Sequence, residues 1–535
     1  MMSKSHASVI NTTVVVLLSM ALAASLLLHI WNPFVPHSPD PPSPPTVGTP
    51  ELDSELAPEP ERRPPQSLVP GQPEPAPEIE PEIEPEIEPE IEPAPDPRIA
   101  ALDAAFDAAQ ALPGLQGAAI GFCLLDGSGQ VLYERHARTA QIPASTLKTL
   151  TTAAALEILG HEFRFKTVLG FAGSRAGETI EGDLILLGGG DPTLVLSDLT
   201  AWAAELAADG LQRVSGRVIG DGRLFAGSVF PDFWDWGDIG NGYGSPVSGL
   251  NLERNRFVAT FSGGDQEGAP AELLGIEPKV PGVTWWNHVL TGPPGSGDGV
   301  MIYGGERAAV MHLRGTVPPM GNLRVRGAVP DPERFVAHHL REALTAVGIE
   351  VAGDAVAAAG LLHEGGDVPE IVEDIRRHQS PPLADIVTSI HASSDNHETE
   401  CLYRTLGVRE GLPPDVVIRR HWAGRGLDFA GLRMVDGSGL ARAGHITPHD
   451  LALVQHLAAT GPSAEIYLES LLLLPVADGA LRIKPGAMSA VRGYTGLALP
   501  ASGEQLSFAL MINHFSDPSS VAALRNALFE VMAKW

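Results

Sequence analysis

At 535 residues the chain is long enough for about three domains, and its 44% hydrophobic and 19% charged residues allow most of it to bury a core. The net charge of −29 argues against nucleic acid or an anionic lipid surface as the main partner. The only cysteines, Cys123 and Cys401, exclude a disulfide framework; two separately buried thiols are expected, with a single bridge as the alternative. There is no C-x-x-C motif, and the spacing of His391, His397 and Glu400 does not indicate a zinc site.

The N-terminus contains an apolar run over residues 13–31, which is close to the roughly 20 residues needed to cross a bilayer. Ala21 and Ala23 form a small-x-small pattern, so a cleaved signal peptide is the alternative. The apolar run continues past this pattern to Trp31, which favours an uncleaved anchor in residues 1–31. In both cases the remainder of the chain is expected outside the cytoplasm.

Residues 32–97 form an acidic, proline-rich segment that holds sixteen acidic residues against Arg62 and Arg63. Such a composition cannot bury enough surface to offset its ordering entropy, so a disordered linker is predicted. Within it, residues 77–93 repeat Glu-Ile-Glu-Pro, and proline at every fourth position forbids a helix interior. We therefore expect an extended, polyproline-like spacer.

The folded part is predicted to begin near Arg98, with a helix over residues 99–112. Residues 117–136 contain two apolar runs around Asp-Gly-Ser-Gly, which predicts a β-hairpin. The next helix is expected to begin after Pro143 and to end at Gly160.

The middle of the chain, residues 170–372, has many short β-like runs separated by glycine and proline, with one helical passage at 332–349. We interpret it as an inserted β-rich region of one or two subdomains. It divides a domain formed by residues 98–169 and 373–535.

The last part of the chain returns to helix over residues 381–408, with a break at Ser-Asp-Asn. Three predicted strands follow, and a final amphipathic helix covers residues 519–534; the strands are 481–489, 494–500 and 506–513. Helices followed by an antiparallel sheet predict an α+β fold.

The first candidate for chemistry is the pair Ser145 and Lys148, three residues apart at the start of a predicted helix and therefore on one face. A helix N-terminus favours developing negative charge, and a lysine whose pKa is lowered by burial can activate a serine. The chain has only six lysines against thirty arginines and a single Ser-x-x-Lys. Arginine cannot act as a base, so a lysine here is informative. The ordinary alternative is a pair on a helix surface.

Two further motifs follow along the chain. Ser394, Asp395 and Asn396 lie in the predicted break between two helices, where the ordinary alternative is a helix N-cap. Lys484 begins a Lys-Pro-Gly motif in the first strand of the predicted C-terminal sheet. Its alternative is a solvated lysine on an edge strand, where proline is tolerated.

Ser-x-x-Lys, Ser-Asp-Asn and Lys-Thr-Gly in this order mark penicillin-binding proteins and class A β-lactamases. Over residues 98–535 the sequence resembles the D-alanyl-D-alanine carboxypeptidase/endopeptidase family, the class C low-molecular-mass penicillin-binding proteins. Further matching blocks cover residues 143–167, 186–194, 243–255, 394–404 and 436–448. The interval of nearly 250 residues between Ser145 and Ser394 also resembles this family, which carries inserted subdomains. The resemblance implies a penicillin-binding/β-lactamase-like α+β fold.

The resemblance also implies a role for each motif residue. Ser145 would attack the carbonyl between two D-alanines to form an acyl-enzyme, and Lys148 would take its proton. Ser394 would relay a proton to the leaving amine, and Asn396 would hold Lys148 and the substrate amide. Lys484 would add positive charge near Ser394 and the substrate carboxylate.

The substrate site implied by the resemblance includes Asp395, Gly486 and Ala487, and the backbone N–H groups of Ser145 and Ala487 would form the oxyanion hole. Water would then release the acyl group, and no metal or organic cofactor is implied. The expected partners are peptidoglycan peptides, β-lactam antibiotics as covalent inhibitors and, through the N-terminal segment, the membrane. The expected location is the periplasmic face of the cell membrane, or the exported soluble phase after signal cleavage.

The sequence departs from the family at Pro485, where relatives have a threonine whose hydroxyl binds the substrate carboxylate. Losing one charge-assisted hydrogen bond costs about 1.5–3 kcal/mol. Arg482, two residues upstream on the same strand face, is the first alternative group for that carboxylate. The segment before Lys484 is also short, and Ser438 is interpreted as a structural turn residue.

These departures leave alternatives open. One is a catalytically weak homologue that binds peptidoglycan as a scaffold. Another is a β-lactamase or esterase built on the same core.

Overall fold

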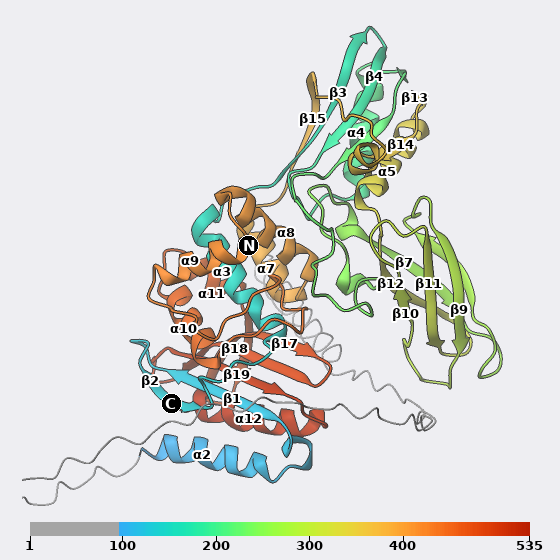
Figure 1. Cartoon of the computed structure of the whole chain (residues 1–535). Helices are drawn as coiled ribbons and strands as arrows, with labels where there is room; N and C mark the ends of the chain where they lie inside the picture. The colour runs from blue at the N-terminus through green and yellow to red at the C-terminus, as the bar shows by residue number, and fades with distance from the viewer. Residues whose placement is uncertain (1–95) are drawn as a thin grey trace, which may run out of the picture. The chain divides into compact units, whose positions relative to one another are not determined.

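The computed structural model of the protein describes residues 96–535 (Figure 1). The predicted membrane segment (1–31) and nearly all of the predicted linker (32–97) lie outside the described residues. Within residues 96–535, none of the helices combines the length and the apolar character that a membrane crossing requires.

A six-stranded antiparallel sheet is formed from both ends of the described chain, in the order β16-β17-β18-β19-β1-β2 (Figure 1). Its strands are β1 (Ala119–Leu125), β2 (Val131–Arg135), β16 (Leu472–Val476), β17 (Gly479–Met488), β18 (Val491–Pro500) and β19 (Leu506–Asn513). Every residue of β19 is buried because helices cover both faces of the sheet. β1 pairs with β19, placing Phe122 opposite Leu510.

One face of this sheet is covered by two helices, α2 (Pro97–Gln110) and α12 (Pro518–Ala533), whose core includes Phe106 and Leu528. The other face carries a helical layer around Leu150, Trp422 and Met511. Its helices are α3 (Lys148–Leu159), α7 (Leu383–Ser393), α8 (Asn396–Glu410), α9 (Pro414–Ala423), α10 (Pro448–Ala459) and α11 (Ala464–Ser470). The predicted α+β fold is confirmed.

The inserted region lies in the chain between α3 and α7 and begins with a seven-stranded sheet. Its main path is β13-β5-β4-β3-β15; β6 also pairs with β4, and β14 pairs with β6. Its strands are β3 (Lys166–Ala176), β4 (Thr179–Leu187), β5 (Arg213–Val214), β6 (Val218–Asp221), β13 (Glu350–Val351), β14 (Ala355–Ala357) and β15 (Glu373–Gln379). Its helices are α4 (Leu196–Ala208), α5 (Pro332–Ala346) and α6 (Ala358–His363).

The entry and exit strands of this region pair with each other, since β15 runs antiparallel to β3 with Gln379 opposite Lys166. Residues 166–169 and 373–379 therefore belong to the inserted sheet, so its ends lie outside the predicted bounds of 170 and 372 by several residues. The local sequence pattern could not reveal this pairing, because β3 and β15 lie about 200 residues apart in the chain.

Two three-stranded sheets complete the inserted region, in the orders β10-β11-β9 and β12-β7-β8 (Figure 1). Their strands are β7 (Arg256–Ser262), β8 (Glu272–Glu277), β9 (Thr284–Thr291), β10 (Met301–Tyr303), β11 (Val310–Val317) and β12 (Asn322–Ala328). Phe257, Val289 and Leu313 share one core with residues of α4 and α5. The predicted β-rich character holds for these sheets, whereas α4 was not anticipated from the sequence.

Candidate active site

Ser145 lies in a single 3-10 turn, Ala144–Leu147, and α3 begins only at Lys148. The preceding residue, Ala144, is buried and adopts the left-handed region with φ 48°. Such a backbone costs about 1–3 kcal/mol and persists only where the surroundings hold it. Gly439 provides one such contact, because a Cβ at this position would lie 2.0 Å from the Ala144 carbonyl oxygen. The turn leaves Ser145 half-buried, so its hydroxyl keeps access to solvent.

Lys148 is fully buried beneath this turn and donates hydrogen bonds from Nζ to three oxygens. The distances are 3.1 Å to Ser145 Oγ, 2.6 Å to Asn396 Oδ1 and 2.8 Å to the Ser438 carbonyl oxygen. Burial lowers the pKa of Lys148 to about 8, although the carboxylates of Asp436 and Glu400 act in the opposite direction. An amine with this pKa is partly neutral near neutral pH and can accept the Ser145 proton.

Ser394 ends α7 in a left-handed conformation, with φ 58°, at the break before α8. Lys484 Nζ donates to Ser394 Oγ at 2.9 Å and to the Pro485 carbonyl oxygen at 2.8 Å. Burial, and then the charge of Lys148, lower the pKa of Lys484 well below its usual range. Lys484 is therefore not the solvated lysine of the alternative interpretation.

The strand that carries Lys484 is the second of the C-terminal sheet, which corrects the expectation that it is the first. β16 precedes it and was missed, because its leucine-rich run shows no alternation of polar and apolar residues. β16 pairs with β17 only as far as Ile483, where Leu472 is the opposite residue. From Lys484 to Met488, β17 keeps its pairing with β18 alone, which leaves its other edge available to an extended peptide.

Gly486 brings β17 into contact with the nucleophile turn. A Cβ at Gly486 would lie 2.8 Å from the Thr146 nitrogen and 2.9 Å from the Ser145 nitrogen, so a side chain has no room. Ala487, the next residue, is exposed. The backbone of Ser145 and the open edge of β17 therefore lie side by side, as an oxyanion hole from Ser145 and Ala487 requires.

Asn396 is engaged at both ends of its amide, since Oδ1 accepts from Lys148 and Nδ2 donates to the Tyr243 carbonyl oxygen at 2.8 Å. One of the two N–H groups of this nitrogen is thus used by the inserted region, and the other is left for the expected contact with a substrate amide. Asp395 caps α8 by accepting from Glu398 N at 3.0 Å, as the helix-cap alternative proposes. Its buried carboxylate binds Arg256, and the structure does not place it in a substrate site.

The inserted region supplies two arginines that the sequence analysis did not single out. Arg256 Nη1 lies 2.7 Å from Asp395 Oδ2, and Arg254 Nη2 lies 2.6 Å from Glu398 Oε1. Arg254 belongs to a run of three left-handed residues, from Glu253 to Asn255, with φ between 52° and 53°. The only sequence signal was the family resemblance of the block 243–255, which contains Arg254 and ends one residue before Arg256.

Ser438 contributes its carbonyl oxygen rather than its hydroxyl, which agrees with the expected structural role and adds a contact with Lys148. Two buried carboxylates hold its loop in place: Glu400 accepts from Ser438 N at 2.7 Å, and Asp436 accepts from Ala441 N at 2.8 Å. Burial, with the nearby Asp436 charge, raises the pKa of Glu400 to about 7. The loop is also tied to the inserted region, because Trp234 Nε1 donates to Asp436 Oδ2 at 2.9 Å.

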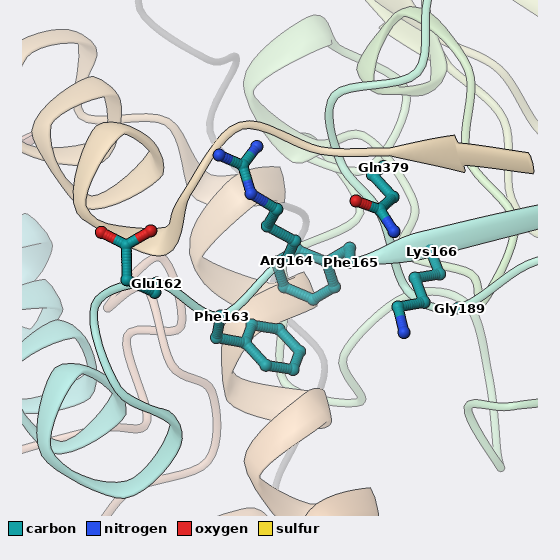
Figure 2. Close-up of a pocket in the computed structure, with 7 residues that line it drawn as sticks. All are labelled: Glu162, Phe163, Arg164, Phe165, Lys166, Gly189 and Gln379. Atoms are coloured by element: carbon teal, nitrogen blue, oxygen red, sulfur yellow. The ribbon is translucent and has the colours of Figure 1, made fainter.

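A cavity of about 500 Å³ lies where the chain enters and leaves the inserted region (Figure 2). Its lining includes Phe163, Lys166, Gly189 and Gln379 and none of the five motif residues with implied catalytic roles. This cavity is separate from the candidate active site.

Within residues 96–535 no group of three or more His, Cys, Asp or Glu side chains is placed to hold a metal ion. Cys123 and Cys401 are buried, separate thiols, as predicted.

The site combines a half-buried serine beside a buried lysine, a second serine bound to another buried lysine, and an open antiparallel strand. Together these features define a serine hydrolase of the penicillin-binding class. This arrangement lies on a sheet covered by helices on both faces. The chain belongs to the D-Ala-D-Ala carboxypeptidase 3 (S13) family, whose profile matches residues 102–535.

Individual relatives agree with this assignment. The chain is 30% identical over 448 residues to a D-alanyl-D-alanine carboxypeptidase of Actinomadura sp. (strain R39), covering 77% of this chain and 80% of the relative. It is 25% identical over 434 residues to the D-alanyl-D-alanine carboxypeptidase DacB of Haemophilus influenzae, covering 76% and 87%. The crystal structure of penicillin binding protein 4 (dacB) from Haemophilus influenzae matches with a TM-score of 0.71 and 21% identity, over 81% of this chain and 99% of that structure. This last match shows the shared fold.

Proposed function

We propose that the protein hydrolyses peptidoglycan stem peptides or cross-links at a D-alanyl carbonyl, through an acyl-enzyme on Ser145. The observation that carries this proposal is the hydrogen bond of 3.1 Å between Lys148 Nζ and Ser145 Oγ, formed by a buried amine whose pKa is about 8. Membership of the D-Ala-D-Ala carboxypeptidase family supports the choice of substrate.

In the acylation step, Lys148 takes the proton of Ser145 Oγ while this oxygen attacks the D-alanyl carbonyl carbon of the substrate. The backbone N–H groups of Ser145 and Ala487 stabilise the oxyanion, and the carbon–nitrogen bond then breaks. Ser394 Oγ, bound to Lys484, delivers a proton to the leaving amine, and the Lys148 proton replaces it. A water molecule then hydrolyses the ester and restores the Ser145 hydroxyl.

β-Lactams are expected to acylate the same serine, because their strained amide carbonyl meets the same nucleophile and the same oxyanion donors. A penicillin-binding protein 4 from Haemophilus influenzae has been crystallised with a β-lactam, and its structure matches this chain with a TM-score of 0.66. No observation on the described residues favours the scaffold, β-lactamase or esterase alternatives.

The test is mass spectrometry of the full-length protein after incubation with benzylpenicillin. The adduct should map to the peptide that contains Ser145, and Ser145→Ala should abolish it. Ser393→Ala is the matched control, because Ser393 is exposed next to Ser394 and bonds only within α7, to the Ser389 carbonyl oxygen. An adduct on another residue, or none at saturating drug, would overturn the assignment of the nucleophile.

We also propose that residues 1–31 anchor the protein in the cell membrane and that residues 32–97 hold its body at the periplasmic face. The apolar run of residues 13–31 and the proline-rich repeat support this, since a polyproline-like segment extends by about 3.1 Å per residue. Full-length protein should sediment with membranes and require detergent for release. A mature protein that begins near Ala24 would show instead that the segment is a cleaved signal.

A further inference from the structure

The outward face of the sheet β10-β11-β9 carries an unusual set of side chains. Trp286 on β9 is opposite His312 on β11, and His312 is opposite Tyr303 on β10. In the next outward row, His288 is opposite Arg314. Successive side chains of a strand alternate between faces, and the inward neighbours of these residues, among them Val289, Met311 and Leu313, lie in the core.

The aromatic rings on this face lie next to one another. The Trp286 and His312 ring centres are 5.2 Å apart, and the His288 and His312 rings are stacked at 6.1 Å with an interplanar angle of 11°. Tyr303 stacks in turn on Trp236 at 6.5 Å and 27°. We call these five residues, Trp236, Trp286, His288, Tyr303 and His312, the aromatic face.

The two tryptophans of the aromatic face are exposed to solvent, Trp286 at 52% and Trp236 at 60%. The other described tryptophans are buried or half-buried; they are Trp202, Trp234, Trp285, Trp422 and Trp535. Large aromatic side chains that are exposed together in a soluble region mark binding surfaces. The aromatic face therefore has the composition of a surface that is covered by a ligand.

The aromatic face is linked to the candidate active site by the chain segment 234–243. Trp236 lies two residues after Trp234, whose indole nitrogen donates to Asp436 in the loop that presents Ser438 to Lys148. Further along the same segment, the Tyr243 carbonyl accepts from Asn396. A polymer whose peptide branch occupies the active site could therefore extend along the neighbouring aromatic face.

We propose that the aromatic face binds the glycan strand of peptidoglycan, a chain of N-acetylated amino sugars, and thereby positions its stem peptides for Ser145. Each pyranose ring has an apolar side of C–H groups, which packs on the negative face of an aromatic ring. The guanidinium of Arg314 lies 5.7 Å from the Tyr303 ring centre, where its N–H groups can donate to sugar acyl groups at the edge of the face. This inference rests on the proposed function for the identity of the polymer.

The direct test is a titration of the full-length protein with peptide-free glycan strands, prepared by amidase treatment of peptidoglycan, and followed by calorimetry. Trp286→Ala combined with His312→Ala should weaken binding roughly tenfold or more, the usual effect of removing central aromatic contacts. Leu274→Ala is the control, because Leu274 is 46% exposed on β8 of the other small sheet. It should leave binding unchanged.

A second measurement separates this inference from the proposed function. Hydrolysis of a small soluble D-alanyl-D-alanine peptide should be the same in the wild type and in the double variant, which also shows that the variant is folded. Hydrolysis of intact peptidoglycan should be slower in the double variant than in the wild type.

Equal glycan binding by the wild type and the double variant would overturn the aromatic face as a glycan site, whatever the peptidase activity. A concentration-dependent dimer that the double variant loses would assign the face to a second copy of the chain instead. Glycan binding without hydrolysis of either substrate would overturn the proposed function and leave the aromatic face in place.

Discussion

Arg256 Nη1 lies 2.7 Å from Asp395 Oδ2, and this ion pair joins the inserted region to the residue between Ser394 and Asn396. Burial alone would raise the pKa of Asp395, but the Arg256 guanidinium and the Glu398 backbone N–H lower it to about 2. The carboxylate therefore stays charged inside the protein, held by a partner from another part of the chain.

The first prediction removes that partner. Arg256→Met should leave the buried Asp395 carboxylate with only the more distant Arg254, whose Nε lies 3.8 Å from Asp395 Oδ2. Breaking a buried ion pair costs up to about 3–5 kcal/mol of unfolding free energy, measured here by urea denaturation. Acylation by penicillin should slow as well, because Ser394 and Asn396 flank the disturbed residue. Arg324→Met, at an exposed position of β12, is the control and should change stability by less than about 0.5 kcal/mol. A similarly small effect of Arg256→Met would contradict the structural role of this ion pair.

The second prediction concerns pH. Because burial lowers the pKa of Lys148 to about 8, its neutral form is the minority below pH 8 and the majority above it. The rate constant for acylation by penicillin should rise with pH, about tenfold per unit below the midpoint, and level off above it. Stopped-flow labelling between pH 6 and 10 measures this profile. Lys148→Arg should be inactive throughout, since a guanidinium does not release its proton. A rate that falls between pH 7 and 9 would refute Lys148 as the base.

The third prediction tests Pro485, which occupies the position of the family threonine on β17. Pro485→Thr restores a hydroxyl for the substrate carboxylate, and one such hydrogen bond corresponds to a gain of about 10- to 100-fold in kcat/KM for a D-alanyl-D-alanine peptide. Pro485→Ala is the matched control, because it removes the ring without adding a hydroxyl. If alanine gives the same gain as threonine, the backbone N–H rather than the hydroxyl is responsible.

If neither substitution changes turnover, another group holds the carboxylate. Arg482 is the first candidate; its Nη1 donates to the Leu468 carbonyl oxygen at 2.8 Å, which leaves its other N–H donors for the carboxylate. Binding measurements with a peptide that lacks the terminal carboxylate would then show whether any charged contact is made.

The fourth prediction uses the contact between β17 and the nucleophile turn. Gly486→Ala places a methyl group less than 3.0 Å from the backbone nitrogens of Ser145 and Thr146, so the strand and the turn must separate. Acylation should fall by at least about 100-fold, in line with the loss of one oxyanion donor, while the protein loses about 1–3 kcal/mol of stability. Gly275→Ala, at a strand position with open space around it, should leave both quantities near their wild-type values. Normal labelling of Gly486→Ala would show that Ser145 does not depend on this contact.

Local sequence patterns predicted one central strand of the sheet and the helix break that carries Ser394. The predicted strand 506–513 matches β19 at both ends, and the predicted break between two helices falls at Ser394. Apolar periodicity and helix breaks are properties of neighbouring residues, so they are visible in one sequence. β16 was missed because its leucines do not alternate with polar residues.

Contacts between distant residues could not be predicted in this way. Lys148 binds the carbonyl of Ser438, 290 positions away, and Asn396 binds the carbonyl of Tyr243, 153 positions away. A backbone carbonyl is present at every residue, so no side-chain pattern marks the ones that are used. The motif serines and lysines were found from a resemblance, whereas these supporting contacts required the fold.

The position of β1 between β2 and β19 imposes an order on folding. β1 ends at Leu125, but its second partner begins only at Leu506, so one edge of β1 stays unpaired until nearly the whole chain has been synthesised. The hairpin of β3 and β4 in the inserted region needs only residues close in sequence and can form earlier. A chain that stops before Leu506 would contain Ser145, Ser394 and Lys484 but would lack the strand that joins the two halves of their sheet. The sheet that carries the nucleophile site therefore cannot be completed until β19 is present.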